Sequence, residues 1–179
     1  RKIVATRLNL EMSLDERILA IACSVGPDMA TIVPEKRAEI TTEGGLDVVK
    51  HFRRVKKAAA ALTKAGIEVS FFIDPVAAQI IRTKEAGVEM VELHTGAYAR
   101  ARTRRQILRK LDTIRKMTEF AQGLGMTVNA GHGLNYNNVQ AIARIAGIAE
   151  LNIGHAIISR AVFVGLEAAV REMVKRIRT

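Results

Sequence analysis

The sequence predicts an α/β fold in which a parallel sheet closes into a barrel of the (β/α)₈ type, and three observations predict it. Six short apolar runs alternate with helical patterns from one end of the 179-residue chain to the other. The centres of these runs lie about 20 to 40 residues apart, a spacing that requires crossover connections and is too long for hairpins. Reactive polar side chains occur at or just after the carboxyl end of each run. In a parallel barrel all such ends meet on one rim.

The runs and the segments between them define six consecutive βα units. The expected strands cover residues 7–12, 29–33, 68–73, 90–94, 127–130 and 150–153. The expected helices cover residues 14–24, 46–65, 76–86, 104–124, 139–146 and 166–177. Four glycines follow helical segments and precede strands, where a left-handed residue ends a helix: Gly66, Gly87, Gly125 and Gly147. Residues 1–179 are therefore expected to form one domain.

An open, doubly wound sheet is the alternative arrangement of repeated βα units. It would concentrate polar groups at one switch point, whereas here they follow every predicted strand, which favours the barrel. Eight strands normally need at least about 200 residues, and this sequence predicts only six. Either two units are absent from this chain, or another surface closes the sheet.

The chain carries 28 Lys and Arg against 18 Asp and Glu, a net charge of +10. The cations cluster in residues 50–57, 100–116 and 171–178, each on an expected helix. In residues 104–124 an apolar stripe runs from Ile107 through Ile114 to Leu124, so the arginines there should face outward. We interpret the clusters as solvated helix faces, with attraction of anionic substrates as an alternative. Nucleic-acid binding is disfavoured because Trp is absent and only two Tyr and five Phe occur.

Composition and terminal sequence bear on the compartment. Apolar residues make up 49% of the chain, but no window is long enough to span a bilayer and the first ten residues do not resemble a signal peptide. The single cysteine, Cys23, cannot form an intramolecular disulfide, which fits a reducing compartment. We therefore expect a cytoplasmic protein with no membrane partner.

Two carboxylates lie inside otherwise apolar expected strands. Glu11 is flanked by Leu10 and Met12, and Glu92 lies in the strand of residues 90–94. A buried carboxylate is costly unless it is paired or used, and desolvation raises its pKa toward a range useful for proton transfer. The alternative is a structural ion pair with Arg7 or Lys36.

Glycine and histidine stand side by side where the last two strands end. His132 lies in a turn between Gly131 and Gly133, where an imidazole suits proton transfer near neutral pH. Gly154 and His155 follow the last strand, and with Gly133 they could let backbone N–H groups approach a phosphate. A merely structural turn is the alternative.

The remaining candidates are a loop and a metal. Residues 34–45 form a polar loop after a strand, and Thr41 in it could bind substrate or cap the following helix. Three histidines follow strand ends, but no spacing places two of them on one helix face, so a catalytic metal is not expected.

Seven of these segments resemble one enzyme family. They are residues 9–12 (NLEM), 33–37 (VPEKR), 41–47 (TTEGGLD), 72–74 (FID), 92–96 (ELHTG), 128–134 (VNAGHGL) and 150–158 (ELNIGHAII). Together they are similar to the pyridoxine 5′-phosphate synthases of vitamin B6 biosynthesis, in order from about residue 6 to the end of the chain.

The resemblance implies a TIM-barrel transferase that condenses 1-deoxy-D-xylulose 5-phosphate with 3-amino-2-oxopropyl phosphate, without a metal or organic cofactor. Glu11 and His132 match the family's acid/base residues, and Glu92 matches a carboxylate that stabilises a transition state. The positions that match substrate or product binding are Thr41, Gly133, Gly154 and His155, the last three around a phosphate. The resemblance also implies small phosphorylated substrates and a homo-oligomer.

The chain departs from the family at its beginning, because members start with two further βα units that supply another acid/base histidine and several substrate-binding groups. A sheet of six strands would leave two exposed edges. We therefore expect a truncated or engineered form, or one that needs another subunit, with reduced catalytic competence. The alternative function is a noncatalytic barrel scaffold or assembly protein.

Overall fold

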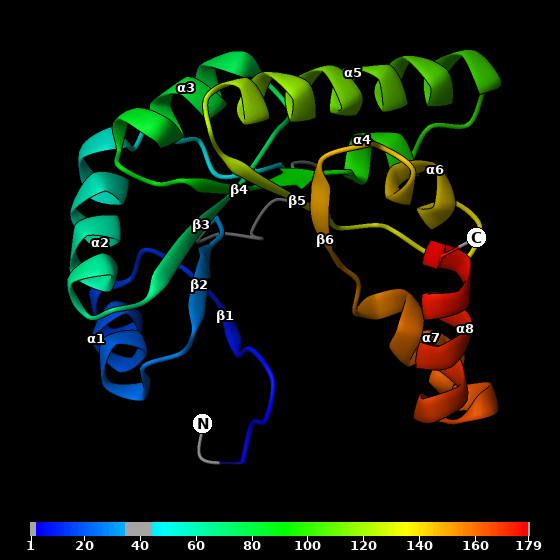
Figure 1. The fold of residues 1–179 in the computed structure, drawn as a ribbon, viewed down its shortest axis with the longest axis horizontal. Helices are drawn as coiled ribbons and strands as arrows, with labels where there is room; N and C mark the ends of the chain where they lie inside the picture. The colour runs from blue at the N-terminus through cyan, green and yellow to red at the C-terminus, as the bar shows by residue number, and fades with distance from the viewer. Residues whose placement is uncertain (1–2, 35–43, 179) are drawn as a thin grey trace.

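A computed structural model describes residues 3–34 and 44–178, which contain a six-stranded, all-parallel sheet (Figure 1). Its strands are β1 (Asn9–Met12), β2 (Met29–Ile32), β3 (Glu68–Ile73), β4 (Met90–His94), β5 (Thr127–Gly131) and β6 (Ile148–Asn152). Each strand pairs with the next one along the chain, in the order β1 to β6. The sheet curves into a half-barrel with a concave face and two open edges, β1 and β6. The parallel, barrel-type prediction is thus confirmed for six strands.

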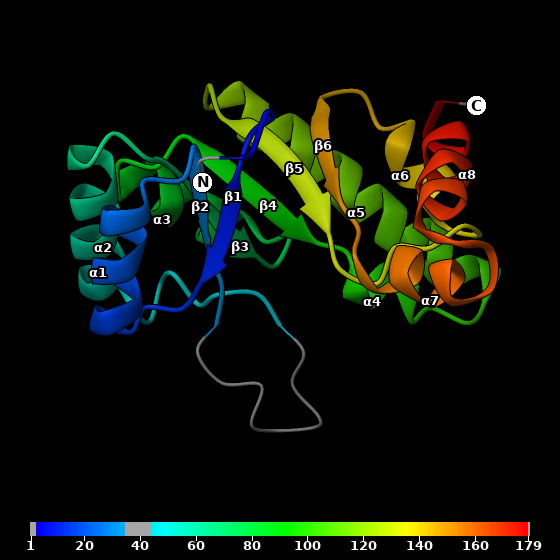
Figure 2. The same cartoon turned by 90° about the horizontal axis from the view of Figure 1, so that it is seen from below.

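The connecting helices cover the convex side of this half-barrel, as Figures 1 and 2 show from two directions. They are α1 (Glu16–Val25), α2 (Phe52–Lys64), α3 (Ala77–Glu85), α5 (Arg104–Gly123) and α6 (Val139–Ala143). A single turn, α4 (Gly96–Ala99), follows β4. Beyond β6 the chain forms α7 (His155–Val164) and α8 (Leu166–Arg178), which lie against each other. No helix in the described ranges is both long and apolar enough to cross a membrane.

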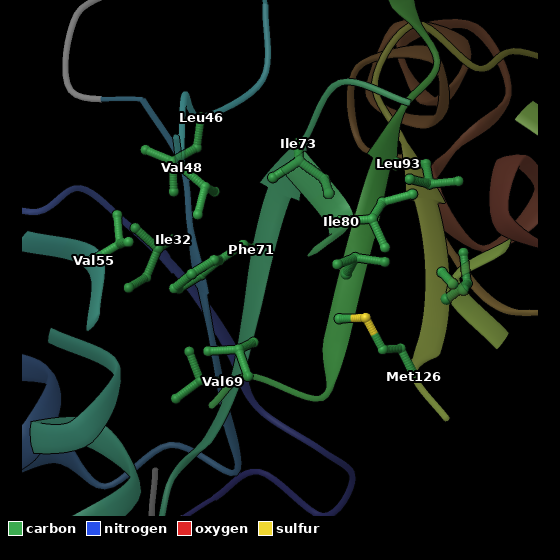
Figure 3. Packing of buried hydrophobic residues seen from close by; sticks show 14 of the residues in the cluster. Ile32, Leu46, Val48, Val55, Val69, Phe71, Ile73, Ile80, Leu93 and Met126 are labelled. Atoms are coloured by element: carbon green, nitrogen blue, oxygen red, sulfur yellow. The ribbon is translucent and has the colours of Figure 1, made fainter. Parts of the chain in front are cut away.

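The hydrophobic core lies between the sheet and the helices that cover it (Figure 3). Alternate strand residues point to opposite faces of a sheet. Ile32, Phe71 and Leu93 are fully buried members of the core cluster, and Val55 of α2 and Ile80 of α3 belong to the same cluster. The intervening strand residues are consequently left for the concave face, where the polar side chains occur.

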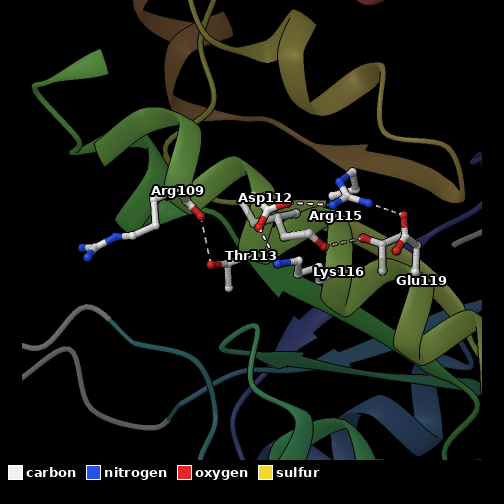
Figure 4. Close-up of polar contacts among 8 residues, drawn as sticks. Arg109, Asp112, Thr113, Arg115, Lys116 and Glu119 are labelled. Carbon is white, nitrogen blue, oxygen red and sulfur yellow. Dashed lines mark hydrogen bonds and ion pairs between the residues drawn. The ribbon is translucent and has the colours of Figure 1, made fainter. Parts of the chain in front are cut away.

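Helix α5 follows its sequence pattern closely. Thr103 and Gln106 form a reciprocal capping box at its beginning, which satisfies free backbone N–H groups. Ile114 is buried on the expected apolar stripe. The opposite face carries exposed ion pairs of Arg115 with Asp112 and Glu119, and Figure 4 shows these contacts. The outward orientation predicted for the basic residues is confirmed for this part of the cluster.

Besides the single turn α4, which was not predicted, three features of the helices differ from the sequence prediction. Helix α2 begins at Phe52, because residues 48–51 form a turn. Helix α6 ends at Ala143, three residues early. Helix α7 was not predicted, and it has no buried residue. Such a helix carries no periodic apolar pattern by which its sequence could reveal it, because it buries no one face.

The far end of the half-barrel exposes large apolar side chains. Val162 and Phe163 of α7 are 79% and 83% exposed. Ile158 of the same helix and Leu166 of α8 are also exposed. These four side chains, which we call the α7–α8 patch, lie beyond the open strand β6. All four belong to two helices that pack against each other, and surfaces that contact another protein expose large apolar side chains of this kind.

Adjacent isoleucines of α3 provide a matched test of the core. Ile80 is fully buried, whereas its neighbour Ile81 is 41% exposed. Replacing Ile80 by Ala leaves a cavity and should lower the free energy of unfolding by about 2–5 kcal/mol. Ile81→Ala should change it by no more than about 0.5 kcal/mol. Urea unfolding followed by circular dichroism measures both, and equal losses would contradict the packing described for α3.

Candidate active site

The candidate residues lie at one end of the half-barrel because its strands are parallel and paired in chain order. Glu11 belongs to β1 and Glu92 to β4, while His132 directly follows β5. Gly154 and His155 follow β6 at the beginning of α7. In Figure 2 the arrows of β1, β4 and β5 point toward the same end of the sheet, as expected of parallel strands.

Glu92 occupies the most unusual environment among the candidates. Its side chain is only 3% exposed, and the Nδ2 group of Asn152 donates a 2.7 Å hydrogen bond to Oε2. Gly131 lies against the other carboxyl oxygen: a Cβ at that position would be 2.1 Å from Oε1. A residue with a side chain at position 131 would therefore displace the carboxyl group.

Burial of Glu92 raises its pKa from 4.5 to about 7. The hydrogen bond from Asn152 opposes this effect, while the negative charges of Glu11 and Glu150 add to it. Glu92 therefore exchanges a proton near neutral pH and can act as either donor or acceptor. The predicted rise of the pKa is confirmed for this residue.

The exposure of Glu11 differs from the burial that the sequence predicted. This residue is exposed rather than buried, because β1 is an edge strand with a neighbour on one side only. Its charge nevertheless acts on Glu92, so the two carboxyl groups share the concave face. Arg7, an alternative partner for these glutamates, pairs with Glu68 instead. Lys36, the other alternative, lies outside the described residues.

His132 is held in an unusual backbone conformation. Its φ of 73° makes it the one residue other than glycine with a positive φ in the described part of the chain. This left-handed conformation costs an ordinary residue about 1–2 kcal/mol. The Thr95 hydroxyl lies 2.6 Å from the His132 carbonyl oxygen and 2.9 Å from that of Gly131, close enough to hold the turn. Strain of this kind is typical of functional positions.

Glycine lies beside each of the two histidines, so no side chain covers the backbone at these two positions of the rim. Gly133 has a φ of 80°, and a Cβ there would lie 2.7 Å from the Cβ of Ala99. Gly154 is exposed and precedes the first turn of α7, where His155 is also exposed. Backbone N–H groups at the beginning of a helix attract anions. Thr41 lies outside the described residues.

Asp74, His94 and Asn152 are not among the candidates predicted from the sequence, although each lies at the carboxyl end of an expected strand. In the structure Asn152 bonds Glu92, and His94 Nδ1 lies 2.8 Å from Asp74 Oδ1. Their signal was the same as that of the candidates, a polar residue at the carboxyl end of a parallel strand. Within residues 3–34 and 44–178, no group of three or more His, Cys, Asp or Glu side chains is arranged to hold a metal ion.

Comparison with known proteins places the chain among enzymes of one kind. The sequence profile of the family described as "Pyridoxal phosphate biosynthesis protein PdxJ" matches residues 1–179. A pyridoxine 5′-phosphate synthase of Trichlorobacter lovleyi is 50% identical over 178 residues, which cover 99% of this chain and 74% of that protein. Its counterpart in a Synechococcus species is 54% identical over 173 residues, covering 97% and 72%.

Solved structures with lower sequence identity resemble the chain in fold. The Amycolatopsis orientalis BexX/CysO complex contains a chain with a TM-score of 0.53 and 19% identity, and the match covers 90% of this chain and 61% of that one. The Xanthomonas citri FimX EAL domain, in complex with c-diGMP, gives a TM-score of 0.53 at 15% identity, covering 79% and 56%. Together with the sheet order, these likenesses identify the fold as a partial TIM-like barrel.

The buried carboxyl of Glu92 makes stability depend on pH. Its pKa is about 7 in the folded chain against 4.5 as a free side chain, so the folded chain retains a proton that the unfolded chain loses. The free energy of unfolding should therefore fall by about 3 kcal/mol as pH rises from about 4.5 to above 7. Glu92→Gln removes the proton exchange and should be the more stable form at pH 8, with no such advantage at pH 4.

Urea unfolding at several pH values measures this difference. Glu89→Gln is the matched control, because Glu89 is an exposed carboxyl just before the same strand, paired with Lys84. The control should keep the pH dependence of the original chain. A Glu92→Gln variant whose advantage does not grow with pH would contradict the burial described for this carboxyl.

Proposed function

The chain belongs to the PdxJ family of pyridoxal phosphate biosynthesis proteins, and on this premise we propose that it is a pyridoxine 5′-phosphate synthase. The reaction would condense 1-deoxy-D-xylulose 5-phosphate with 3-amino-2-oxopropyl phosphate, release inorganic phosphate and water, and close the pyridine ring. The observation that carries the proposal is the buried Glu92, which exchanges a proton near neutral pH on a concave face shared with Glu11.

Ring closure through imine formation, dehydration and enolisation requires several proton transfers, hence more than one acid/base group. We assign Glu11 and His132 to these transfers, since both are exposed to a ligand on the concave side or rim. Glu92 stabilises charge that develops during the reaction, and Asn152 orients its carboxyl group by the hydrogen bond to Oε2. The three groups come from β1, β4 and the end of β5, so one small molecule can lie between them.

The phosphate of a substrate or product would bind beside Gly133, Gly154 and His155. At Gly133 the close approach of Ala99 excludes a side chain, so the backbone itself borders the rim. Gly154 is the N-cap of α7 and His155 its first residue, and the first N–H groups of this ten-residue helix favour an anion. Thr41 completes the set of proposed substrate-binding residues.

A homo-oligomer working in the cytoplasm is part of the proposal. The α7–α8 patch supports association, because its large apolar side chains are exposed to water. A second copy that covers this patch would remove apolar surface from water.

Replacing His132 by Ala tests the assignment of the reaction. The side chain is exposed, so its removal should leave the fold intact and lower turnover by about 10²–10⁴-fold, the usual contribution of a general acid/base. His51→Ala is the matched control, because His51 precedes α2 and has no role in the proposed site. Mass spectrometry of pyridoxine 5′-phosphate formed from both substrates measures turnover.

Unchanged turnover in His132→Ala would remove this residue from its assigned role. If the original chain forms no product but elutes as a defined assembly in size-exclusion chromatography with light scattering, the scaffold alternative is supported instead. Product formed by the original chain and by His51→Ala, with loss in His132→Ala, supports the synthase.

A further inference from the structure

Three rings from three neighbouring strands meet at the rim. Phe72 of β3 and His94 of β4 make an edge-to-face contact with ring centroids 5.1 Å apart. His94 makes a second such contact, at 5.0 Å, with His132 after β5, and Phe72 lies 6.2 Å from the same ring. Phe72 and His94 are buried, whereas His132 is exposed. The two buried rings therefore form a wall against which the exposed imidazole rests.

The buried histidine is itself held by a carboxylate. Asp74 Oδ1 lies 2.8 Å from His94 Nδ1, and this hydrogen bond is the main reason why the pKa of Asp74 is lowered. Asp74 also accepts a hydrogen bond from the backbone N–H of Gly45, where a Cβ would lie 2.3 Å from the Asp74 nitrogen. Asp74 is thus ionised at neutral pH and can only accept, so the proton of a neutral His94 ring must lie on Nδ1.

His94 has little room to rotate. A Cβ on Gly96 would lie 2.4 Å from His94 Nε2, so the backbone of the following turn borders that side of the ring. The side chain is only 3% exposed, which prevents direct contact with a substrate. Any influence of His94 on the reaction must therefore pass through a neighbour, and the neighbour to which the proposed function assigns a proton transfer is His132.

We propose that Asp74 and His94 are positioning residues for His132. Asp74 fixes the tautomer and orientation of His94, and the His94 ring, with Phe72, fixes the direction in which the His132 imidazole projects from the rim. The proposal rests on the acid/base role assigned to His132 under the proposed function. It adds a second support to the hydrogen bond that the Thr95 hydroxyl donates to the His132 carbonyl oxygen.

Asp74→Asn tests the proposal while preserving shape. An amide can either donate or accept, so it no longer specifies which His94 nitrogen carries the proton. We expect kcat to fall about 10- to 100-fold with little change in KM, because an acid/base group misplaced by about 1 Å can lose that much. Asp112→Asn, on the outer face of α5, is the matched control and should retain kcat. An Asp74→Asn variant with full kcat, or with a change in KM alone, would overturn the proposal.

Nuclear magnetic resonance of ¹⁵N-labelled histidines supplies a readout that does not depend on turnover. The original chain should show His94 protonated at Nδ1, and Asp74→Asn should show both tautomers together with a displaced His132 resonance. His94 protonated only at Nε2, or a His132 resonance that does not move, would overturn the proposal even if the chain is a synthase. Conversely, the expected spectra in a chain that makes no product would support the positioning contact and count against the proposed reaction.

Two substitutions of His94 cover the case in which Asp74→Asn does not fold. His94→Phe keeps a ring against His132 but loses the bond to Asp74, whereas His94→Ala loses both. The proposal expects kcat to decrease in the order original chain, His94→Phe, His94→Ala. Equal kcat in all three would contradict it.

Discussion

The parallel pairing of β4 with β5 is the constraint on which the site depends. Its register places Glu92 opposite Asn129 and His94 opposite Gly131. The missing side chain of Gly131 leaves the space that a carboxyl oxygen of Glu92 occupies. His132 directly follows β5, so the same register also brings its ring to 5.0 Å from the ring of His94. Pairing of Gly131 with Asn152 of β6 then supplies the hydrogen bond to Glu92.

The two faces of the sheet serve opposite purposes. The convex face buries apolar side chains such as Phe71 and Ile73 under the helices, and this burial stabilises the fold. The concave face holds a desolvated carboxyl at Glu92 and a left-handed histidine at position 132, both of which cost stability. The free energy gained by burying apolar side chains on the convex face offsets the cost of the polar groups on the concave face.

Local sequence patterns predicted those features of the fold that depend on neighbouring residues in the chain. The six strands, their parallel arrangement and the glycines after the helices were predicted correctly, and Gly66, Gly87, Gly125 and Gly147 all have positive φ. The raised pKa of Glu92 was predicted correctly, because its carboxyl group lies within an otherwise apolar strand.

Contacts between distant segments could not be predicted in this way. Asn152 and Glu92 are 60 residues apart, and His94 and Asp74 are 20 apart, so their bonds depend on sheet register and curvature. The exposure of Glu11 depends on β1 being an edge strand, which its own sequence does not encode. Helix α7 has no buried face and thus no periodic signal.

The carboxyl groups of Glu11 on β1 and Glu92 on β4 interact across a single concave surface. A ¹³C magnetic resonance titration of the Glu92 carboxyl, in the original chain and in Glu11→Gln, tests it directly. We expect a midpoint at about pH 7 in the original chain and a lower one in the variant, because one negative charge near Glu92 has been removed. A midpoint near 4.5 in the original chain, or the same midpoint in both, would contradict it.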